Sequence, residues 1–126
     1  MHGLVEIRIK IFFQGVDMID NEKETAVLMK AMEENFPIPV LPTRELQRLI
    51  RKNKILLPKG HSLQIDKVHY LGDEGGICCR LALPEGSEEA LITSVTHLRI
   101  HPGHCLAKEI AKYQKRRVKK LRKLHS

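Results

Sequence analysis

Aromatic side chains are scarce in this sequence, which contains three phenylalanines, two tyrosines and no tryptophan. With so few rings, a hydrophobic core must be built mainly from Leu, Ile, Val and Met. Proteins that bind single-stranded nucleic acid without sequence preference stack bases on exposed aromatic rings. The composition therefore disfavours a base-stacking platform.

The sequence also lacks the marks of a secreted or membrane protein. The three cysteines, Cys78, Cys79 and Cys105, are odd in number and two are adjacent, which argues against a disulfide framework. Residues 4–13 alternate charged and apolar side chains, unlike the apolar part of a signal peptide. No apolar run reaches the length of a membrane span. We therefore expect a cytoplasmic location and no transmembrane segment.

Positive charge is concentrated in one segment. Residues 105–126 hold nine Lys or Arg and one acidic residue, whereas residues 1–104 hold 13 basic and 14 acidic residues. A nearly neutral body with a cationic segment indicates an interaction with a polyanion.

The periodicities predict a single α+β domain over residues 1–126, a length that closes a core without disulfides or metals. We expect the order β-α-α-β-β-β-α and a mostly antiparallel sheet of about four strands, covered on one face by helices. Strands are predicted over residues 4–13, 63–71, 77–83 and 90–100, with turns at 72–76 and 84–87.

Two N-cap patterns mark the first two helices. Asn21 is followed three positions later by Glu24, the spacing of a capping box, and predicts a helix to about residue 35. Thr43 predicts the cap of a short helix over 44–53. The three prolines within residues 37–42 predict an extended linker between the two helices.

A long amphipathic helix is expected from near His104 to Leu124, packed on the sheet. Projection at about 100° per residue gathers an apolar stripe. The stripe consists of Ala107, Ile110, Ala111, Gln114, Val118 and Leu121, widened by Leu106, Tyr113 and Leu124. The basic residues fill the opposite arc, with Arg117 at the edge of the stripe, so the helix is expected to present its cations to solvent.

This basic helix is the main functional candidate. Lys and Arg that contact phosphates release condensed counterions, which supplies affinity without any base-reading motif. We expect a non-enzymatic module that binds a polyanion, nucleic acid or a ribonucleoprotein, through this helix and the outer face of the second one. The predicted contact residues are Lys108, Lys112, Lys115, Arg116, Lys119, Lys120, Arg122, Lys123, Arg44, Arg48 and Arg51.

Three alternatives stay open. The charge run can be a solvated face that only favours solubility. The helix can instead meet an acidic protein surface or the acidic turns of a second copy, so a protein-interaction or self-assembling, homo-oligomeric domain is the main alternative. Binding along an anionic membrane has less support, because the apolar stripe lacks Trp and Phe anchors.

From Thr43 onward the expected order α-β-β-β-α, ending in a basic helix, resembles that of double-stranded-RNA-binding domains. Such domains place lysines at the start of the last helix against phosphates, and Lys108 and Lys112 match those positions. The basic cluster that usually precedes this helix is replaced by residues 100–104, Ile-His-Pro-Gly-His. The resemblance covers about two thirds of the chain, in element order only.

Metal or thiol chemistry has weaker support. His97, His101, His104 and Cys105 fall within nine residues, and imidazole and thiolate bind zinc, but their spacing matches no standard zinc pattern. A neutral imidazole that caps the last helix suits His101 or His104 better, because a cation would oppose the helix dipole. Cys105 lies near the expected start of a helix, where thiols can become reactive, but catalysis also needs a base and an oxyanion site, and only the histidines suggest a base. No pair of carboxylates has a spacing that suggests acid-base catalysis. We expect no catalytic residue, no metal and no other cofactor.

Overall fold

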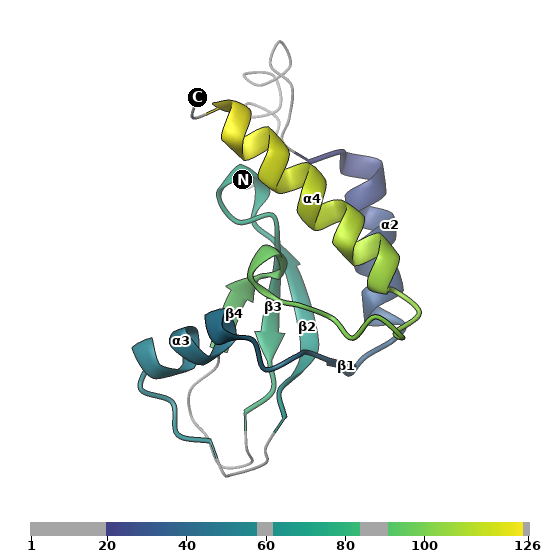
Figure 1. Cartoon of the computed structure of the whole chain (residues 1–126). Helices are drawn as coiled ribbons and strands as arrows, with labels where there is room; N and C mark the ends of the chain where they lie inside the picture. The colour runs from purple at the N-terminus through teal and green to yellow at the C-terminus, as the bar shows by residue number, and fades with distance from the viewer. Residues whose placement is uncertain (1–19, 58–61, 84–90, 125–126) are drawn as a thin grey trace, which may run out of the picture.

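The computed structural model of the chain describes residues 20–57, 62–83 and 91–124 (Figure 1). Its elements are α2 (Glu22–Glu33), β1 (Ile38–Pro39), α3 (Arg44–Lys52), β2 (Gln64–Tyr70), the 3-10 turn η1 (Gly72–Glu74), β3 (Ile77–Leu81), β4 (Leu91–Ser94), the 3-10 turn η2 (Val95–His97) and α4 (Ala107–Leu124). Three α-helices and a four-stranded sheet in these ranges make the fold α+β, as the sequence predicted. None of these helices has the length and apolar character needed to cross a bilayer.

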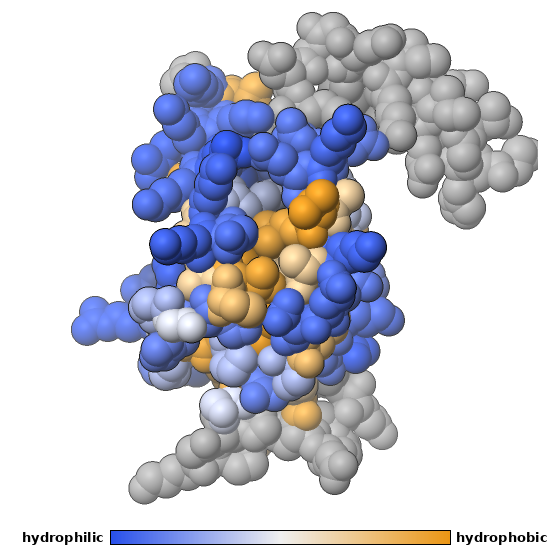
Figure 2. All heavy atoms as spheres, turned by 90° about the vertical axis from the view of Figure 1, so that its right-hand side faces the viewer, coloured by the Kyte–Doolittle hydropathy of each residue, from blue (hydrophilic) through white to orange (hydrophobic). Residues whose placement is uncertain are grey.

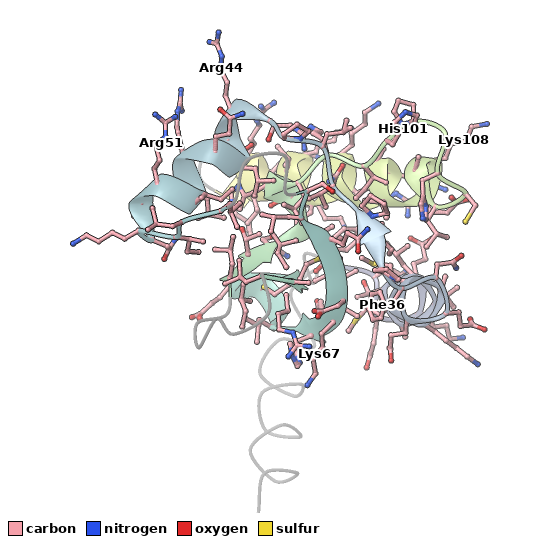
Figure 3. The ribbon with its side chains drawn as sticks, turned by 90° about the horizontal axis from the view of Figure 1, so that it is seen from below. Phe36, Arg44, Arg51, Lys67, His101 and Lys108 are labelled. Carbon is pink, nitrogen blue, oxygen red and sulfur yellow. The ribbon has the colours of Figure 1, made fainter. Side chains whose placement is uncertain are left out.

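The sheet has the strand order β1-β2-β3-β4, and each neighbouring pair is antiparallel. A bulge at Asp66 shifts the register of β2 against β3, and the Asp66 carboxylate binds the Arg80 guanidinium at 2.8 Å. Beyond the bulge, Lys67 lies on the side of the sheet turned away from α4 (Figure 3). α4 and Lys67 thus lie on different sides of the sheet.

One hydrophobic core joins the elements. Leu28 and Met32 of α2, Leu46 of α3 and Ile110 of α4 belong to the same buried cluster as the strand residues. No aromatic side chain of the described residues is fully buried, so the core is aliphatic, as the composition predicted. Figure 1 shows α2 and α4 next to each other on one side of the sheet, with α3 apart from them.

Both predicted N-caps are confirmed. The Asn21 side-chain oxygen accepts a hydrogen bond from the Glu24 backbone N–H at 3.0 Å, and the Thr43 hydroxyl accepts one from the Leu46 N–H at 3.1 Å. α2 and α3 begin one residue after these caps. Beyond the C-cap of α3, Lys54 has φ 55°, the left-handed region that costs a side-chain-bearing residue free energy.

The boundaries differ from the prediction in three places. The proline linker contains β1, whose Pro39 pairs with Gln64 at the edge of the sheet, where the missing N–H is tolerated. The strand expected over 90–100 ends at Ser94, because the Ser94 hydroxyl caps η2. α4 begins at Ala107 rather than near His104. The strand expected over 4–13 and the turn expected over 84–87 lie outside the described residues.

Candidate functional site

The side of α4 turned to the interior is the predicted stripe, and it includes Arg117. Ile110 and Arg117 are buried, Tyr113 and Val118 are half-buried, and Leu124 is exposed. The sequence placed Arg117 at the edge of the stripe, apart from the outward cations, and only 3% of its surface is exposed. The helix therefore turns a guanidinium toward the interior.

Arg117 is buried because it meets a carboxylate there. Its Nη1 donates to Asp20 Oδ2 at 3.0 Å, and its Nη2 donates to the backbone oxygen of Asp73 at 2.6 Å. The same Asp20 oxygen accepts hydrogen bonds from the hydroxyls of Tyr70 and Tyr113, both at 2.9 Å. The Arg117 and Asp20 side chains are 3% and 2% exposed. These hydrogen bonds offset the cost of removing both charges from water.

The Tyr113 hydroxyl lies at the centre of this network. It accepts a hydrogen bond from the Ile77 N–H at 3.0 Å while it donates to Asp20. Gly76 leaves room for it, because a Cβ at Gly76, which has φ 63°, would lie 2.4 Å from the hydroxyl oxygen. Burial, and in addition the bond to Asp20, raises the pKa of Tyr113 and of Tyr70 above the ordinary tyrosine value. Both hydroxyls therefore stay protonated donors.

The network determines which cations of α4 face solvent. Arg116, the neighbour of Arg117, is 48% exposed on its side chain and pairs with Glu24 of α2. Two arginines of the basic segment are thus matched by carboxylates of the same chain. Arg116 remains a predicted contact residue, but its pairing with Glu24 directs attention to the other flank of the helix.

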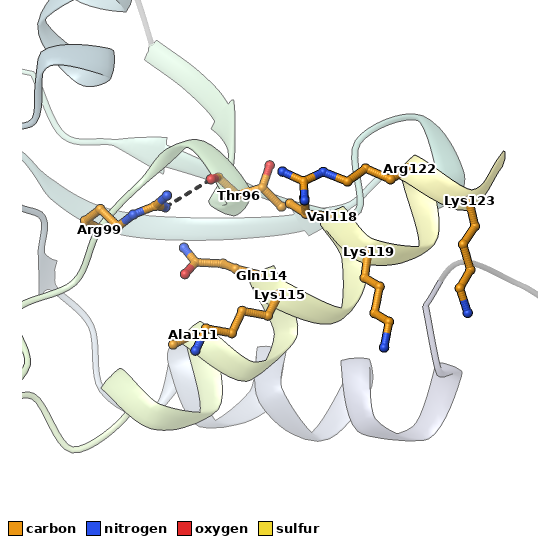
Figure 4. Close-up of a pocket in the computed structure, with 9 residues that line it drawn as sticks. All are labelled: Thr96, Arg99, Ala111, Gln114, Lys115, Val118, Lys119, Arg122 and Lys123. Atoms are coloured by element: carbon orange, nitrogen blue, oxygen red, sulfur yellow. Dashed lines mark hydrogen bonds between the residues drawn. The ribbon is translucent and has the colours of Figure 1, made fainter. Parts of the chain in front are cut away.

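That other flank forms a groove of about 780 Å³ between α4 and the segment from η2 to Arg99 (Figure 4). Among its lining residues within the described chain, five are cations and none is a carboxylate. The five cations are Arg99, Lys115, Lys119, Arg122 and Lys123. We call this the cationic groove.

Hydrogen bonds hold the two walls of the cationic groove together. The Gln114 side-chain amide of α4 donates to the backbone oxygens of Val95 and Leu98, both at 2.7 Å. Arg99 Nη1 donates to the oxygens of Thr96 and Leu98 at 3.2 and 2.8 Å. The guanidinium of Arg99 is therefore oriented before any ligand arrives, which reduces the ordering cost of binding.

A second groove, of about 680 Å³, lies between α2 and α4. Its lining includes the apolar side chains of Val27, Leu28 and Ala31 and the ring of Tyr113. Figure 2 shows a hydrophobic band on this side of the molecule, flanked by hydrophilic surface. Charged residues of both signs border it, among them Lys112 and Glu109. We call this the amphipathic groove.

The predicted contact residues do not share one surface. Those that line the cationic groove are Lys115, Lys119, Arg122 and Lys123. Those that border the amphipathic groove are Lys112, Arg116, Lys119, Lys120 and Lys123. Lys108, and Arg44, Arg48 and Arg51 of α3, are exposed and line neither groove. In Figure 3, Arg44 and Arg51 lie at the end of the molecule opposite Lys108.

The histidine and cysteine candidates have other partners. His97 Nδ1 bonds to Glu45 Oε1 of α3 at 2.6 Å. His101 and His104 each accept, at Nδ1, a hydrogen bond from the backbone N–H two residues later, at 2.9 and 3.0 Å. Across the described ranges, no three His, Cys, Asp or Glu side chains are placed to hold a metal ion. His101 and His104 thus order the turns that lead into α4.

The cysteines are not arranged for catalysis. Cys79 is fully buried in the core, as its alternation with Ile77 and Leu81 predicted, and burial raises its pKa to about 12. Burial also raises the pKa of Cys78. Both thiols therefore stay protonated and unreactive near neutral pH. Cys105 is exposed, and its thiol points to the Asn35 side-chain oxygen at 3.4 Å.

Sequence reasoning missed Asp20, Arg99 and Gln114. Asp20 precedes a helix cap, where an acidic residue is ordinary, and Arg99 fell inside an expected strand. Their roles arise from contacts with residues distant in sequence, such as the Asp20–Arg117 pair. The one available sign was Arg117 itself, the single cation that projection placed against the apolar stripe.

Comparison with protein families, curated proteins and solved structures found no match to the chain. The element order shared with double-stranded-RNA-binding domains is therefore not accompanied by a family match. A function for this chain has to be inferred from its own two grooves.

Proposed function

We propose that the chain is a non-enzymatic binding module that holds the phosphate backbone of a nucleic acid, alone or within a ribonucleoprotein, in the cationic groove. The observation that supports this is the lining of five cations without a carboxylate. Arg99, Lys115, Lys119 and Arg122 gather positive charge along this groove, which attracts a phosphate backbone and releases its condensed counterions on binding.

The side chains of the groove favour backbone contact over base recognition. Among the residues that the structure describes, no aromatic ring lines the groove, so none of them offers bases a stacking surface there. The Gln114 amide, a group that can read a base edge, is occupied by two backbone oxygens. Arg99 and Arg122 offer planar donors that suit phosphate oxygens, and the lysines act as point charges. We therefore expect binding with little sequence preference.

The size of the electrostatic effect follows from the number of cations. If all five residues contact phosphates of a duplex, the logarithm of the binding constant falls with the logarithm of salt concentration with a slope of about −4.5. A fourfold rise in salt then weakens binding by a factor of several hundred, on the order of 10² to 10³.

The test is fluorescence anisotropy with a labelled duplex oligonucleotide of mixed sequence, titrated at several salt concentrations. The variant Lys115→Gln/Lys119→Gln/Arg122→Gln removes three groove cations. It is expected to lower the affinity and to reduce the magnitude of the salt slope by about three, because three phosphate contacts are lost.

The matched control is Arg44→Gln/Arg48→Gln/Arg51→Gln, which removes three exposed charges from α3, outside the groove. It is expected to keep most of the affinity. Equal losses in the two triple variants would mean that net charge alone attracts the duplex. Unchanged binding by the groove variant, or a loss only in the α3 variant, would also reject the proposal.

A further inference from the structure

The amphipathic groove between α2 and α4 exposes apolar surface that no described residue covers. Val27 of α2 is 71% exposed, next to the buried Leu28 and the half-buried Ala31. Removal of apolar surface from water is favourable, so an occupant that covers this surface gains free energy. Other exposed apolar residues, such as Leu56 and Ile92, line neither groove.

The charges around this groove select the occupant. Six of its lining residues are cations and three are carboxylates. Two of these carboxylates are already matched within the chain, Asp20 by Arg117 and Glu24 by Arg116. Lys23, Lys112 and Lys119 then stand against one further carboxylate, Glu109, so the rim keeps an excess of positive charge and is complementary to an acidic partner.

The length of α2, which lines the groove, suits a helical partner. α2 has 12 residues and is therefore about 18 Å long at 1.5 Å per residue. A partner helix of about three turns matches this length, and it can place apolar residues at i, i+4 and i+7 over the band of Val27, Leu28 and Ala31. Its acidic residues then reach the lysines on the rim, such as Lys23 and Lys112.

We infer that the amphipathic groove is a docking site for an acidic amphipathic helix of a partner protein. A nucleic acid suits this groove less well than the cationic one. Glu24 and Glu109 border it and would repel phosphates, and an apolar floor offers a phosphate no partner. The two grooves share Lys119 and Lys123, but Val27, Leu28 and Ala31 line only the amphipathic groove, so the inference stands or fails separately from the proposed function.

The test uses the full chain and a designed peptide as the probe. The peptide has about 14 residues, with Leu at i, i+4, i+7 and i+11 and Glu at most other positions, and it carries a fluorescent label. Its control is a scrambled peptide of the same composition, which has the same charge but no apolar stripe. We expect the scrambled peptide to bind at least about tenfold more weakly in anisotropy titrations, since only the ordered stripe can cover the groove floor.

The groove is located with a matched pair of variants. Val27→Glu places a negative charge on the groove floor, and Leu56→Glu makes the same change at a residue that is 93% exposed and outside the groove. Glu has a higher helix propensity than Val, so α2 is expected to persist, which circular dichroism verifies. Val27→Glu is expected to weaken peptide binding at least about tenfold, whereas Leu56→Glu leaves it unchanged.

Four results would overturn the inference. The first is failure of the designed peptide to bind the unmodified chain, or equal binding by the scrambled peptide, which shows general attraction to charge. The second is unchanged binding by Val27→Glu. The third is a dimer that Val27→Glu dissociates in light scattering, which makes a second copy the occupant. The fourth is a gain in peptide affinity on Ile7→Asp/Ile9→Asp, which makes residues 4–13 the occupant.

Discussion

Two adjacent arginines of α4 offer a direct test of how this helix is held. Arg117 is 3% exposed and bonds to Asp20, which is 2% exposed on its side chain. Arg116 is 48% exposed and pairs with Glu24, which is 57% exposed. Replacement of each arginine by Met keeps a flexible chain of similar length and removes one charge from the same helix. The two variants therefore differ mainly in the burial of the carboxylate left behind.

The expected losses follow from that burial. Arg117→Met leaves the Asp20 carboxylate buried without its cation and the Asp73 backbone oxygen without a donor. Removal of one partner of a buried pair costs about 3 to 5 kcal/mol. Tyr70 and Tyr113 continue to donate to Asp20, so we expect about 3 kcal/mol, at the lower end of this range. Arg116→Met is expected to cost about 1 kcal/mol or less, because its partner regains full hydration.

The assay is urea unfolding at neutral pH, followed by far-UV circular dichroism, with the free energy of unfolding extrapolated to water for each variant. The double variant Asp20→Ala/Arg117→Met adds a coupling measurement. It is expected to lose less than the sum of the single losses, because no buried charge remains unpaired. A difference of less than about 1 kcal/mol between Arg117→Met and Arg116→Met would refute the account of the buried network.

Two further predictions concern other parts of the fold. Tyr70 and Tyr113 are the chain's two tyrosines, and the raised pKa of each means that tyrosinate absorbance of the native protein appears above the usual pH of about 10. Because the native state holds these protons more tightly, the stability that the two hydroxyls contribute is complete below pH about 10 and is lost as the pH rises toward the raised pKa. Asp20→Asn is expected to shift the ionisation of both tyrosines back toward pH about 10. Ordinary titration of both tyrosines in the native protein would contradict this account. Lys54→Gly relieves the left-handed φ of 55° and is expected to stabilise the protein by about 0.5 to 1 kcal/mol in urea unfolding, whereas Arg48→Gly in the middle of α3 costs a similar amount. A neutral or destabilising Lys54→Gly would show that the turn carries no strain.

The parts of the fold that were predicted correctly depend on neighbours in sequence. Asn21 and Thr43 cap their helices through backbone N–H groups three residues away, and such contacts can be recognised in a short window. β1 could not be recognised in this way, because its pairing with Gln64 is a tertiary contact and Pro39 disfavours strands in general. The end of β4 was missed for a different reason. Residues 95–100 keep apolar residues at Val95, Leu98 and Ile100, with Val95 and Leu98 buried, although the backbone has left the sheet.

The candidate site was predictable in part for the same reason. Lys115, Lys119 and Arg122 recur at helical spacing, so their common flank follows from the sequence. Arg99 joins them only because η2 packs against α4. The partner of Arg117 was not predictable. A guanidinium is buried only where an opposite charge pairs with it, and that charge, Asp20, lies 97 residues earlier in the sequence.

The separation of Asp20 and Arg117 along the chain has a consequence for how the molecule folds. A contact between residues 97 positions apart closes a long loop, and the entropy of that closure must be lost before the pair contributes anything. Until Arg117 arrives, the Asp20 carboxylate favours water over the interior. The first turn of α2 is therefore expected to form its native contacts late, in the same cooperative step in which the basic helix packs. During synthesis, this step requires that the ribosome has already released the basic helix.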